Sequence, residues 1–454
     1  MRIINLLAAS PARLGRYFPV RIGCAMRRTG ITLLATLLPV ASFAAPTTLD
    51  DLFLRVAGSS SGFAGAYYAD DGSLRVVVRP GGKTLTYWEK RRALSALVGV
   101  FGRDVLEPVP AMKRSQPGIG RVSYQTARYS FAELHRWYQR LRPVLAQRGV
   151  TFTDIDERAN RLIVGVPYGK PNSAISKFIG GLNIPSAAIV YEDSQDLYYY
   201  YSGSIIGNEQ EPVLGGVELG VQAGGKCTLG FSAMFPNWWW TQAGFVTAGH
   251  CGSFGDWSND TFTHPEDGQQ IAAEFYNPGF IGGEDCNSNG CRYSDSALVA
   301  YDQGVEFAMP AKIIRTRDFN SDVNVDDANP TIPITGESPW LLSGDNVNKI
   351  GVGSGGGGGW TRAPITNTCV DWDAPHDQSL TFLCQYEVQS ADGTNIACQG
   401  DSGAPIFFFH ETIWPFAAMA GTLLGGVTAP CSDTFIFSPM SGIREDLGEF
   451  TIPR

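Results

Sequence analysis

Charged residues are scarce in this chain, and the charge that it carries is not mainly basic. Only 17% of the 454 residues are charged, and the formal net charge is −9. Such a chain lacks the general basic face with which proteins bind nucleic acid, so no nucleic-acid partner is expected. Cysteine pairs with zinc-site spacing and glycine-rich phosphate loops followed by lysine are also missing, so neither a metal nor another cofactor is expected. What is abundant, 53 glycines, 27 prolines and 11% aromatics, is typical of a loop-rich β protein.

Long apolar runs are missing too, including at the N-terminus. The apolar stretch at 31–40 is too short to span a bilayer comfortably. Two arginines precede it and small residues follow it, which is the pattern of a secretory signal peptide over residues 1–45, cleaved after Ala44. Residues 1–25 are either an extended basic region of that peptide or lie before a true start at Met26. The pattern predicts a secreted, extracellular protein without a membrane anchor.

Cysteine is absent from residues 46–211, whereas residues 212–454 hold all but one of the nine. The exception, Cys24, lies in the predicted signal peptide. An even number of cysteines in an exported protein predicts disulfides, although spacing alone does not select among the many pairings. The length and this division predict two folded parts after the signal peptide. The cysteines of the second part are Cys227, Cys251, Cys286, Cys291, Cys369, Cys384, Cys398 and Cys431.

The most informative stretch is Cys-Gln-Gly-Asp-Ser-Gly-Ala-Pro at 398–405. It places Ser402 in a glycine-rich turn of the kind that exposes a nucleophilic hydroxyl. Gly400 has no Cβ, so the backbone there can approach a substrate carbonyl closely. We therefore expect Ser402 to attack the substrate, with the N–H groups of Gly400 and Ser402 forming an oxyanion hole.

Histidine is scarce, with five in the chain, and one of them suits the role of general base. His250 ends the run Phe-Val-Thr-Ala-Gly-His-Cys at 245–251, where a strand end would hold the imidazole rigidly. Asp295 precedes an alternating, strand-like run and could orient that imidazole and stabilise its protonated form. Asp285 and Asp302 are the alternatives for this third role.

Three motifs, in this order along the chain, resemble those of chymotrypsin-like serine endopeptidases. They are Thr-Ala-Gly-His-Cys, Asp-Ser-Ala-Leu-Val and Cys-x-Gly-Asp-Ser-Gly-Ala-Pro. Residues 215–216 and 226–231 resemble the start of the mature domain in the secreted bacterial branch, the streptogrisin and α-lytic protease type. The resemblance implies an all-β catalytic domain of two six-stranded antiparallel β-barrels over residues 212–454. It also implies that His250, Asp295 and Ser402 form the catalytic triad.

The same resemblance implies how the cysteines pair. Cys227–Cys251 would lie beside the catalytic histidine and Cys398–Cys431 beside the specificity pocket. Of the remaining four, Cys286–Cys291 would close a small loop and Cys369–Cys384 a hairpin.

Residues 46–211 have the pattern of a smaller α+β unit. Alternating residues at 67–79 predict a hairpin, and residues 161–166 predict a strand. Ser130, with Glu133 three residues later, predicts a capping box for a helix over 130–148.

This unit is either an independent domain with a binding function of its own or a pro-region. Residues 154–162 resemble the pro-region of the same bacterial proteases, which assists folding and then inhibits the protease until it is removed. A pair of β-barrels with many non-local contacts folds slowly, so a folding template has a physical rationale. We expect the maturation cut within 195–214, with the tyrosines at 198–201 occupying the active site.

Three features depart from the family's pattern. The family neutralises the carboxylate equivalent to Asp401 with an arginine that is missing here at the matching place. Because an uncompensated buried carboxylate is costly, either Arg362 or the new N-terminus is expected to take that role. The glycine run at 355–359 predicts a flexible loop. Leu424 replaces a hydroxyl residue that in the family supports the aspartate of the triad.

Substrate preference depends on the residue six positions before the nucleophile, which lies at the pocket base in this fold. Isoleucine at this place, Ile396, predicts cleavage after apolar or aromatic residues. Gly425 and Gly426 would form a pocket wall that admits a side chain. Asp433 supports the alternative, a preference for basic residues.

These patterns predict a monomeric serine-type endopeptidase, made as an inactive precursor, that acts on protein or peptide substrates and binds its own pro-region. Two other classes stay open. One is a catalytically inactive relative that serves as a binding module, and the other is an acyl-transfer enzyme acting on small esters.

Overall fold

The structure is a computed structural model, and the chain divides into two compact units, residues 1–45 and 46–454. The predicted signal peptide lies outside the described residues, as do Asp285, the expected cut region from residue 200 to 211, and residues 355 and 356 of the glycine run. Within the second unit we call residues 47–199 the N-terminal part and residues 212–454 the barrel part. The structure describes residues 47–106, 121–199, 212–221, 225–237, 240–254, 260–264, 268–282, 286, 290–318, 324–338, 340–353, 357–375, 377–409 and 416–454.

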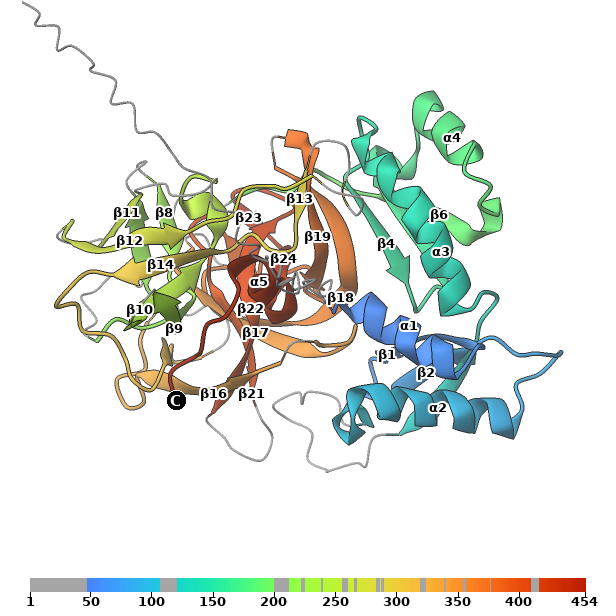
Figure 1. Cartoon of the computed structure of the whole chain (residues 1–454), viewed down its shortest axis with the longest axis horizontal. Helices are drawn as coiled ribbons and strands as arrows, with labels where there is room; N and C mark the ends of the chain where they lie inside the picture. The colour runs from blue at the N-terminus through green and yellow to red at the C-terminus, as the bar shows by residue number, and fades with distance from the viewer. Residues whose placement is uncertain are drawn as a thin grey trace, which may run out of the picture. The chain divides into compact units, whose positions relative to one another are not determined.

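The first half of the barrel part is a cycle of antiparallel strands (Figure 1). Its hydrogen-bonded order is β8-β7-β11-β12-β14-β10-β9. Only Leu229 and Gly230 separate β8 from β9, so these two act as one bent strand, and the cycle closes as a six-stranded barrel. The strands are β7 (Glu218–Val221), β8 (Lys226–Thr228), β9 (Phe231–Asn237), β10 (Trp240–Thr247), β11 (Thr261–Thr263), β12 (Gln270–Tyr276) and β14 (Ala297–Tyr301).

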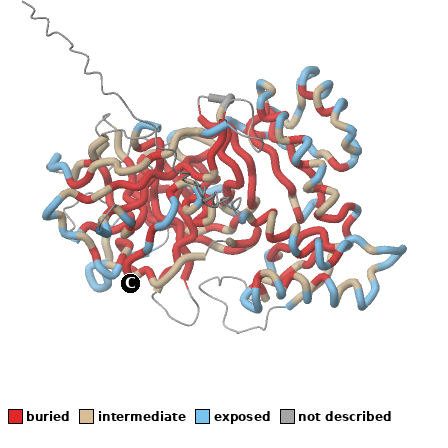
Figure 2. The backbone as a smooth tube through the Cα atoms, viewed as in Figure 1, coloured by how far each residue is buried: buried red, intermediate tan, exposed pale blue. Residues whose placement is uncertain are grey.

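The second half is also a closed antiparallel cycle. Its order is β19-β24-β22-β21-β17-β18, and β18 pairs again with β19. Figure 2 shows that buried residues run along much of the strands of both barrels. Burial is continuous along β21, β22 and β24, so residues on both faces of these strands are covered. The strands are β17 (Asn346–Gly351), β18 (Gly359–Ala374), β19 (Asp377–Gln389), β21 (Pro405–Phe409), β22 (Ala417–Gly426) and β24 (Thr434–Pro439).

Short elements complete the barrel part. The 3₁₀ turn η5 (Gly249–Cys251) follows β10, and β13 (Cys291–Arg292) pairs in parallel with β19. The helix α5 (Met440–Leu447) follows β24 near the C-terminus. The remaining strands are β15 (Lys312–Ile314), β16 (Thr331–Glu337), β20 (Ala397–Cys398) and β23 (Cys431–Ser432).

The N-terminal part is α+β. Its first sheet has the order β1-β2-β3, and its other strands, β4, β5 and β6, continue the second barrel because β4 pairs with β18. The helices are α1 (Leu49–Ser59), α2 (Tyr87–Phe101), α3 (Phe131–Leu141) and α4 (Ser173–Gly180), with 3₁₀ turns at Arg103–Leu106, Arg142–Ala146, Pro167–Gly169 and Ser186–Ala188. The strands are β1 (Phe63–Tyr68), β2 (Leu74–Val78), β3 (Val122–Thr126), β4 (Phe152–Asp156), β5 (Arg161–Val166) and β6 (Ile189–Asp193).

Local signals in the N-terminal part match the structure closely. The capping box forms, since the side chain of Ser130 accepts from the Glu133 amide and Glu133 accepts from the Ser130 amide. The predicted strand at 161–166 is β5. The predicted helix is shorter than expected and changes to the 3₁₀ turn Arg142–Ala146, because the proline at 143 cannot continue the α-helical hydrogen bonding.

The hydrophobic packing follows this organisation. One core cluster joins the N-terminal part to the second barrel and includes Phe53, Phe131, Val347 and Tyr386. A second cluster fills the first barrel and extends to α5. The fold class expected from the sequence, an all-β catalytic domain of two six-stranded barrels after a smaller α+β part, is confirmed.

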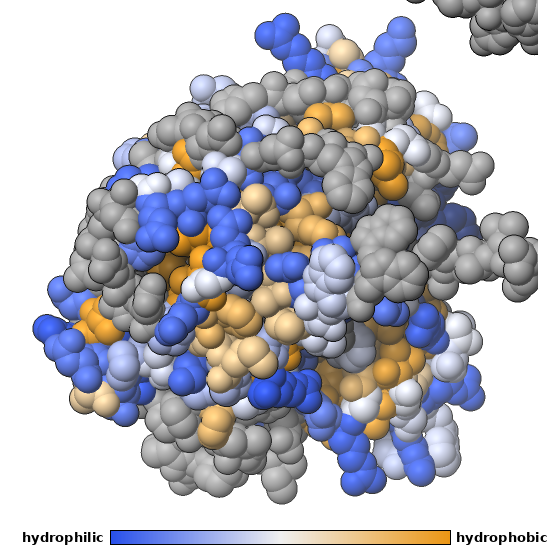
Figure 3. Space-filling model, turned by 60° about the vertical axis from the view of Figure 1, so that its left-hand side comes forward, coloured by the Kyte–Doolittle hydropathy of each residue, from blue (hydrophilic) through white to orange (hydrophobic). Residues whose placement is uncertain are grey.

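The surface and the disulfides complete the description. The described residues on the face in Figure 3 are a mixture of hydrophilic and hydrophobic ones. Among the described residues, no helix is both long and apolar enough to cross a membrane. Four disulfides match the expected pairing: Cys227–Cys251, Cys286–Cys291, Cys369–Cys384 and Cys398–Cys431.

Candidate active site

The predicted triad residues meet between the two barrels. His250 lies in η5 and Asp295 in the turn between β13 and β14, whereas Ser402 lies in the turn between β20 and β21. The Nε2 atom of His250 is 2.8 Å from Ser402 Oγ, and its Nδ1 is 2.5 Å from Asp295 Oδ2. The backbone amide of His250 donates to Asp295 Oδ1 at 3.0 Å. All three residues are buried, so this chain of hydrogen bonds is held away from bulk water.

Close approach of the histidine turn to the aspartate explains the glycine before His250. A Cβ atom on Gly249 would lie 2.9 Å from Asp295 Oδ1, closer than packed atoms tolerate. Asp302, an alternative partner, lies elsewhere: its amide donates to Ile271 O, and its Oδ2 accepts from Gln270. Of the candidates in the described residues, Asp295 is the one beside His250.

The turn that carries Ser402 depends on two glycines in the left-handed region, Gly400 (φ +103°) and Gly403 (φ +84°). A Cβ atom on Gly403 would lie 2.2 Å from Thr247 Oγ1, so no other residue fits there. The turn is tied to β8, because Thr228 Oγ1 donates to Gly400 O at 2.7 Å and the Thr228 amide donates to Ser402 O at 2.8 Å.

The counter-ion of Asp401 is Lys349, a residue that the sequence did not indicate. Lys349 Nζ lies 2.6 Å from Asp401 Oδ2, and both side chains are fully buried. In the uncut chain the expected role of Arg362 is therefore taken by Lys349. Burial lowers the pKa of Lys349, while the carboxylate of Asp401 acts to raise it. The amides of Gly353 and Cys398 also donate to this carboxylate, each at 2.8 Å.

The glycines around this ion pair are close-packed, so the expected flexible loop is wrong for the part of the run that the structure describes. A Cβ atom on Gly358 would lie 1.6 Å from Gly353 O, and one on Gly357 would lie 2.9 Å from Cys398 Sγ. Gly357 O accepts a hydrogen bond from Lys349 Nζ at 2.7 Å. Glycine is needed here because the backbone wraps around the buried ion pair.

Two of the predicted pocket residues lie near each other. Ile396 is 4% exposed, its amide donates to Ser432 O, and its carbonyl accepts from Thr361 Oγ1. The antiparallel pairing of β20 with β23 brings Ile396 beside the segment that carries Asp433. Asp433 is half-buried and accepts from Thr434 Oγ1 at 3.0 Å.

The other two pocket residues, Gly425 and Gly426, end β22, and the chain before residue 200 lies against them. The Tyr198 amide donates to Gly426 O at 2.8 Å, and the Gly426 amide donates to Tyr198 O at 3.1 Å. A Cβ atom on Gly425 would lie 2.2 Å from Tyr198 O. The ring of Tyr199 stacks on His250 with centroids 3.9 Å apart, whereas the tyrosines at 200 and 201 lie outside the described residues.

The hydroxyl that Leu424 replaces has a partial substitute. Leu424 is fully buried and packs in an apolar cluster with Leu197. Ser438 Oγ instead accepts from the amide of Asp295 at 2.8 Å. Ser438 therefore holds the backbone of Asp295 in place of the missing hydroxyl. Ser438 lies on β24, outside the sequence motifs that predicted the site.

Within the part of the chain that the structure describes, one group of metal-ligand atoms lies close together: those of Cys227, His250 and Cys251. The two sulfurs are joined in a disulfide. They are therefore not thiolates, the form in which cysteine ligates a metal.

Comparisons with known proteins complete the description of the site. No protein-family model and no curated protein matches the chain. It is similar to the solved structure of Thermobifida fusca protease A, with 18% identity over 52% of this chain and 96% of that chain and a TM-score of 0.35. It is also similar to Rv3671c from M. tuberculosis, with 15% identity over 48% of this chain and 84% of that one and a TM-score of 0.26.

A mutant of human heparin binding protein is similar at 14% identity, with 55% of this chain and 94% of that chain covered and a TM-score of 0.28. The class of fold rests on the strand order itself: two six-stranded antiparallel barrels of the chymotrypsin-like type follow a smaller α+β part.

Proposed function

We propose that the chain is the precursor of a secreted serine endopeptidase. The observation that carries this proposal is the continuous chain of contacts from Ser402 Oγ through His250 to Asp295. A nucleophile within hydrogen-bond reach of a base, with the base oriented by a carboxylate, is the arrangement needed to activate a hydroxyl.

In this proposal Ser402 Oγ attacks the carbonyl carbon of a peptide bond while His250 Nε2 takes its proton. Asp295 stabilises the imidazolium, and the N–H groups of Gly400 and Ser402 stabilise the negatively charged oxygen of the tetrahedral intermediate. His250 then gives its proton to the leaving amine, which leaves an acyl group on Ser402. A water molecule, activated by the same imidazole, hydrolyses that ester and restores the serine.

The test is hydrolysis of a protein substrate by the matured protein beside its Ser402→Ala variant. We expect cleavage by the first and none above background by the second. If both are inactive although correctly folded, the alternative of a binding module without catalysis replaces this proposal. Hydrolysis of small esters without cleavage of any peptide would favour the acyl-transfer alternative.

We further propose that residues 46–211 are an inhibitory pro-region that is cut away within 195–214. Support comes from the contacts of Tyr198 with Gly426 and of Tyr199 with His250, because an extended chain in this place blocks access of a substrate. Intact-mass measurement of the secreted protein tests the cut. A full 46–454 chain with activity would contradict it.

For specificity we propose cleavage after apolar or aromatic residues, supported by the buried, uncharged Ile396. Chromogenic peptides that end in Phe, Leu, Ala or Arg distinguish this from the alternative. A preference for Arg would assign the selecting role to Asp433.

A further inference from the structure

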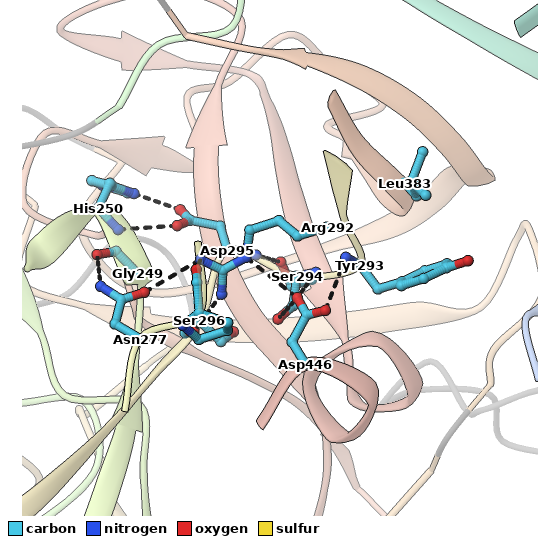
Figure 4. A network of polar contacts seen from close by, with 12 residues as sticks. Gly249, His250, Asn277, Arg292, Tyr293, Ser294, Asp295, Ser296, Leu383 and Asp446 are labelled. Atoms are coloured by element: carbon cyan, nitrogen blue, oxygen red, sulfur yellow. Dashed lines mark hydrogen bonds and ion pairs between the residues drawn. The ribbon is translucent and has the colours of Figure 1, made fainter. Parts of the chain in front are cut away.

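A buried arginine lies behind the candidate triad and is not explained by the proposed reaction. Arg292 ends β13, three residues before Asp295, and is 1% exposed. Burying a guanidinium is costly unless its donors are satisfied, so its partners indicate what it does. Figure 4 shows that these partners surround Asp295 and the turn of His250.

The first set of partners fixes the backbone on both sides of Asp295. Arg292 Nη2 donates to Ser296 O at 2.7 Å, on the C-terminal side. Its Nε lies 3.3 Å from Asp446 Oδ2 on α5. The same Asp446 carboxylate accepts from the amide of Ser294 at 2.6 Å and from its hydroxyl at 2.9 Å, on the N-terminal side.

The second set reaches the histidine. Arg292 Nη1 donates to Asn277 Oδ1 at 3.3 Å and to Pro278 O at 2.7 Å. Asn277 is fully buried, and its Nδ2 donates to Gly249 O at 2.8 Å, directly before His250. Because an arginine can only donate, it also fixes which end of the Asn277 amide faces the histidine turn.

Only a guanidinium suits this place. Its planar fork addresses the carbonyl of Ser296, the carboxylate of Asp446 and the amide of Asn277 in different directions at once. The rings of Phe254 and Phe280 lie 5.4 and 6.0 Å from the guanidinium carbon and fix its plane further. A lysine at this position would keep the charge but lose the fork.

We infer that Arg292 is a positioning residue for the catalytic pair. Through Ser296 and Asp446 it fixes the turn that presents Asp295, and through Asn277 it fixes the turn that presents His250. The two contacts between His250 and Asp295 are therefore maintained by one buried cation. This inference rests on the proposed serine endopeptidase function.

The chain offers a matched control in Arg444, an arginine on the helix that also carries Asp446. Arg444 lies on α5, two residues before Asp446, and forms a bidentate ion pair with Glu337, with both contacts at 2.7 Å. Its remaining contacts, with the carbonyl and the ring of Phe450, do not involve the triad. A lysine at either arginine loses the fork, but only one of the two substitutions should change catalysis.

The experiment compares Arg292→Lys with Arg444→Lys in the matured protein on one chromogenic peptide. For Arg292→Lys we expect kcat to fall about 10- to 100-fold with little change in KM, because small displacements of reacting groups cost factors of this size. The low-pH limb of its activity profile should move to lower pH, since an imidazole without an aligned carboxylate binds the catalytic proton less tightly. Arg444→Lys should keep kcat near that of the unmodified protein, and unfolding in urea measures the stability of both. Equal kcat values for the two variants would overturn the inference.

A second measurement does not depend on activity. In the Ser402→Ala precursor, proton NMR detects the hydrogen of the His250–Asp295 hydrogen bond at low field. We expect this signal to weaken in Arg292→Lys and to persist in Arg444→Lys, and an unchanged signal in Arg292→Lys contradicts the inference. If Arg292→Lys does not fold, Asp446→Asn is measured instead, with a smaller loss of kcat and of signal expected in the same direction. A protein that is inactive without any substitution would contradict the proposed function, whereas this signal would still decide the role of Arg292.

Discussion

The two parts of the molecule treat their buried acids in opposite ways. In the barrel part, Asp401 is paired with Lys349, and Asp446 with Arg292. In the N-terminal part, burial and mutual repulsion raise the pKa of Asp50, Asp154 and Glu157 well above the ordinary values. Each group therefore favours its neutral, protonated form in the folded chain.

The surroundings of these three acids are themselves mostly acidic. Asp50 on α1 faces Asp51, Asp371 and Arg142, but Arg142 already pairs with Asp371. The further acids around Asp154 and Glu157 are Asp156 on β4 and Glu387 on β19, and burial raises the pKa of Glu387 to about 6. Among the described atoms, Asp154 Oδ1 and Glu157 Oε1 have no hydrogen-bond partner.

This difference suggests how durable each part is. The barrel part has buried ion pairs and all four disulfides, so above the pKa of Glu387, about 6, we expect its stability to change little with pH. The N-terminal part has no disulfide among its described residues, and its stability depends on protonated carboxyls. This contrast is consistent with our proposal that the N-terminal part is a pro-region that is removed from a durable enzyme.

The largest effect should follow from breaking a pair in the barrel part. Lys349→Met leaves the carboxylate of Asp401 buried without a cation, and loss of one partner of such a pair costs about 3–5 kcal/mol. Unfolding of the protein in urea measures this loss. Arg317→Met, which removes an exposed partner of Asp327, is the control and should change stability little. Equal stability of the two variants would show that the buried pair is not needed.

The pH dependence of the precursor comes next. Because the folded pKa values of Asp50, Asp154 and Glu157 exceed the unfolded ones, their stabilising effect is complete at low pH and is lost as the pH rises through the folded values. As the pH rises above the ordinary carboxyl pKa values of about 4, we therefore expect the Ser402→Ala precursor to lose more stability than the matured protein, which lacks these three acids under our proposal.

Thermal unfolding across this range measures both proteins. The half-buried His135, whose pKa is lowered by partial burial, opposes the trend only towards acid, because its protonation destabilises the fold there. Parallel curves for the two proteins would remove the proposed contrast.

A single substitution among Asp50, Asp154 and Glu157 should reduce the pH dependence of the precursor's stability towards that of the matured protein. Asp154→Asn keeps the shape and removes the charge, and each pKa unit corresponds to about 1.4 kcal/mol. We expect the precursor to gain stability at the alkaline end, because the amide has no charge to bury, and to change little at the acid end. Asp70→Asn, on a side chain that is 97% exposed, is the control. A uniform change at all pH values would point to packing instead of charge.

The smallest effect is expected at a helix cap. Ser130→Ala removes half of the capping box of α3 and should cost the precursor about 1 kcal/mol. Under our proposal the matured protein lacks this helix and therefore does not contain the substitution. Matured protein from either precursor should have the same stability, which serves as the control. A loss far above this value would indicate that α3 also controls the packing against β4.

Sequence alone predicted those features that depend on short contiguous motifs. The turn of Ser402, the strand end of His250 and the capping box of α3 each lie within a few residues of chain, so their local chemistry is readable. The resemblance provided the barrels and the disulfides.

What could not be predicted depends on contacts across the barrels. Lys349 and Asp401 are separated by 52 residues, and the register of β17 brings them together. Asp446 meets Arg292 across 154 residues. The glycine run predicted flexibility because its composition does not reveal the ion pair around which it closes.

The most direct test of the central claim is to map the adduct of a fluorophosphonate on the matured protein. The account predicts a single adduct on Ser402, none on the Ser402→Ala variant and much slower labelling of the His250→Ala variant, because the hydroxyl needs its base. Absence of an adduct on correctly matured protein, or an adduct on another residue, would contradict it.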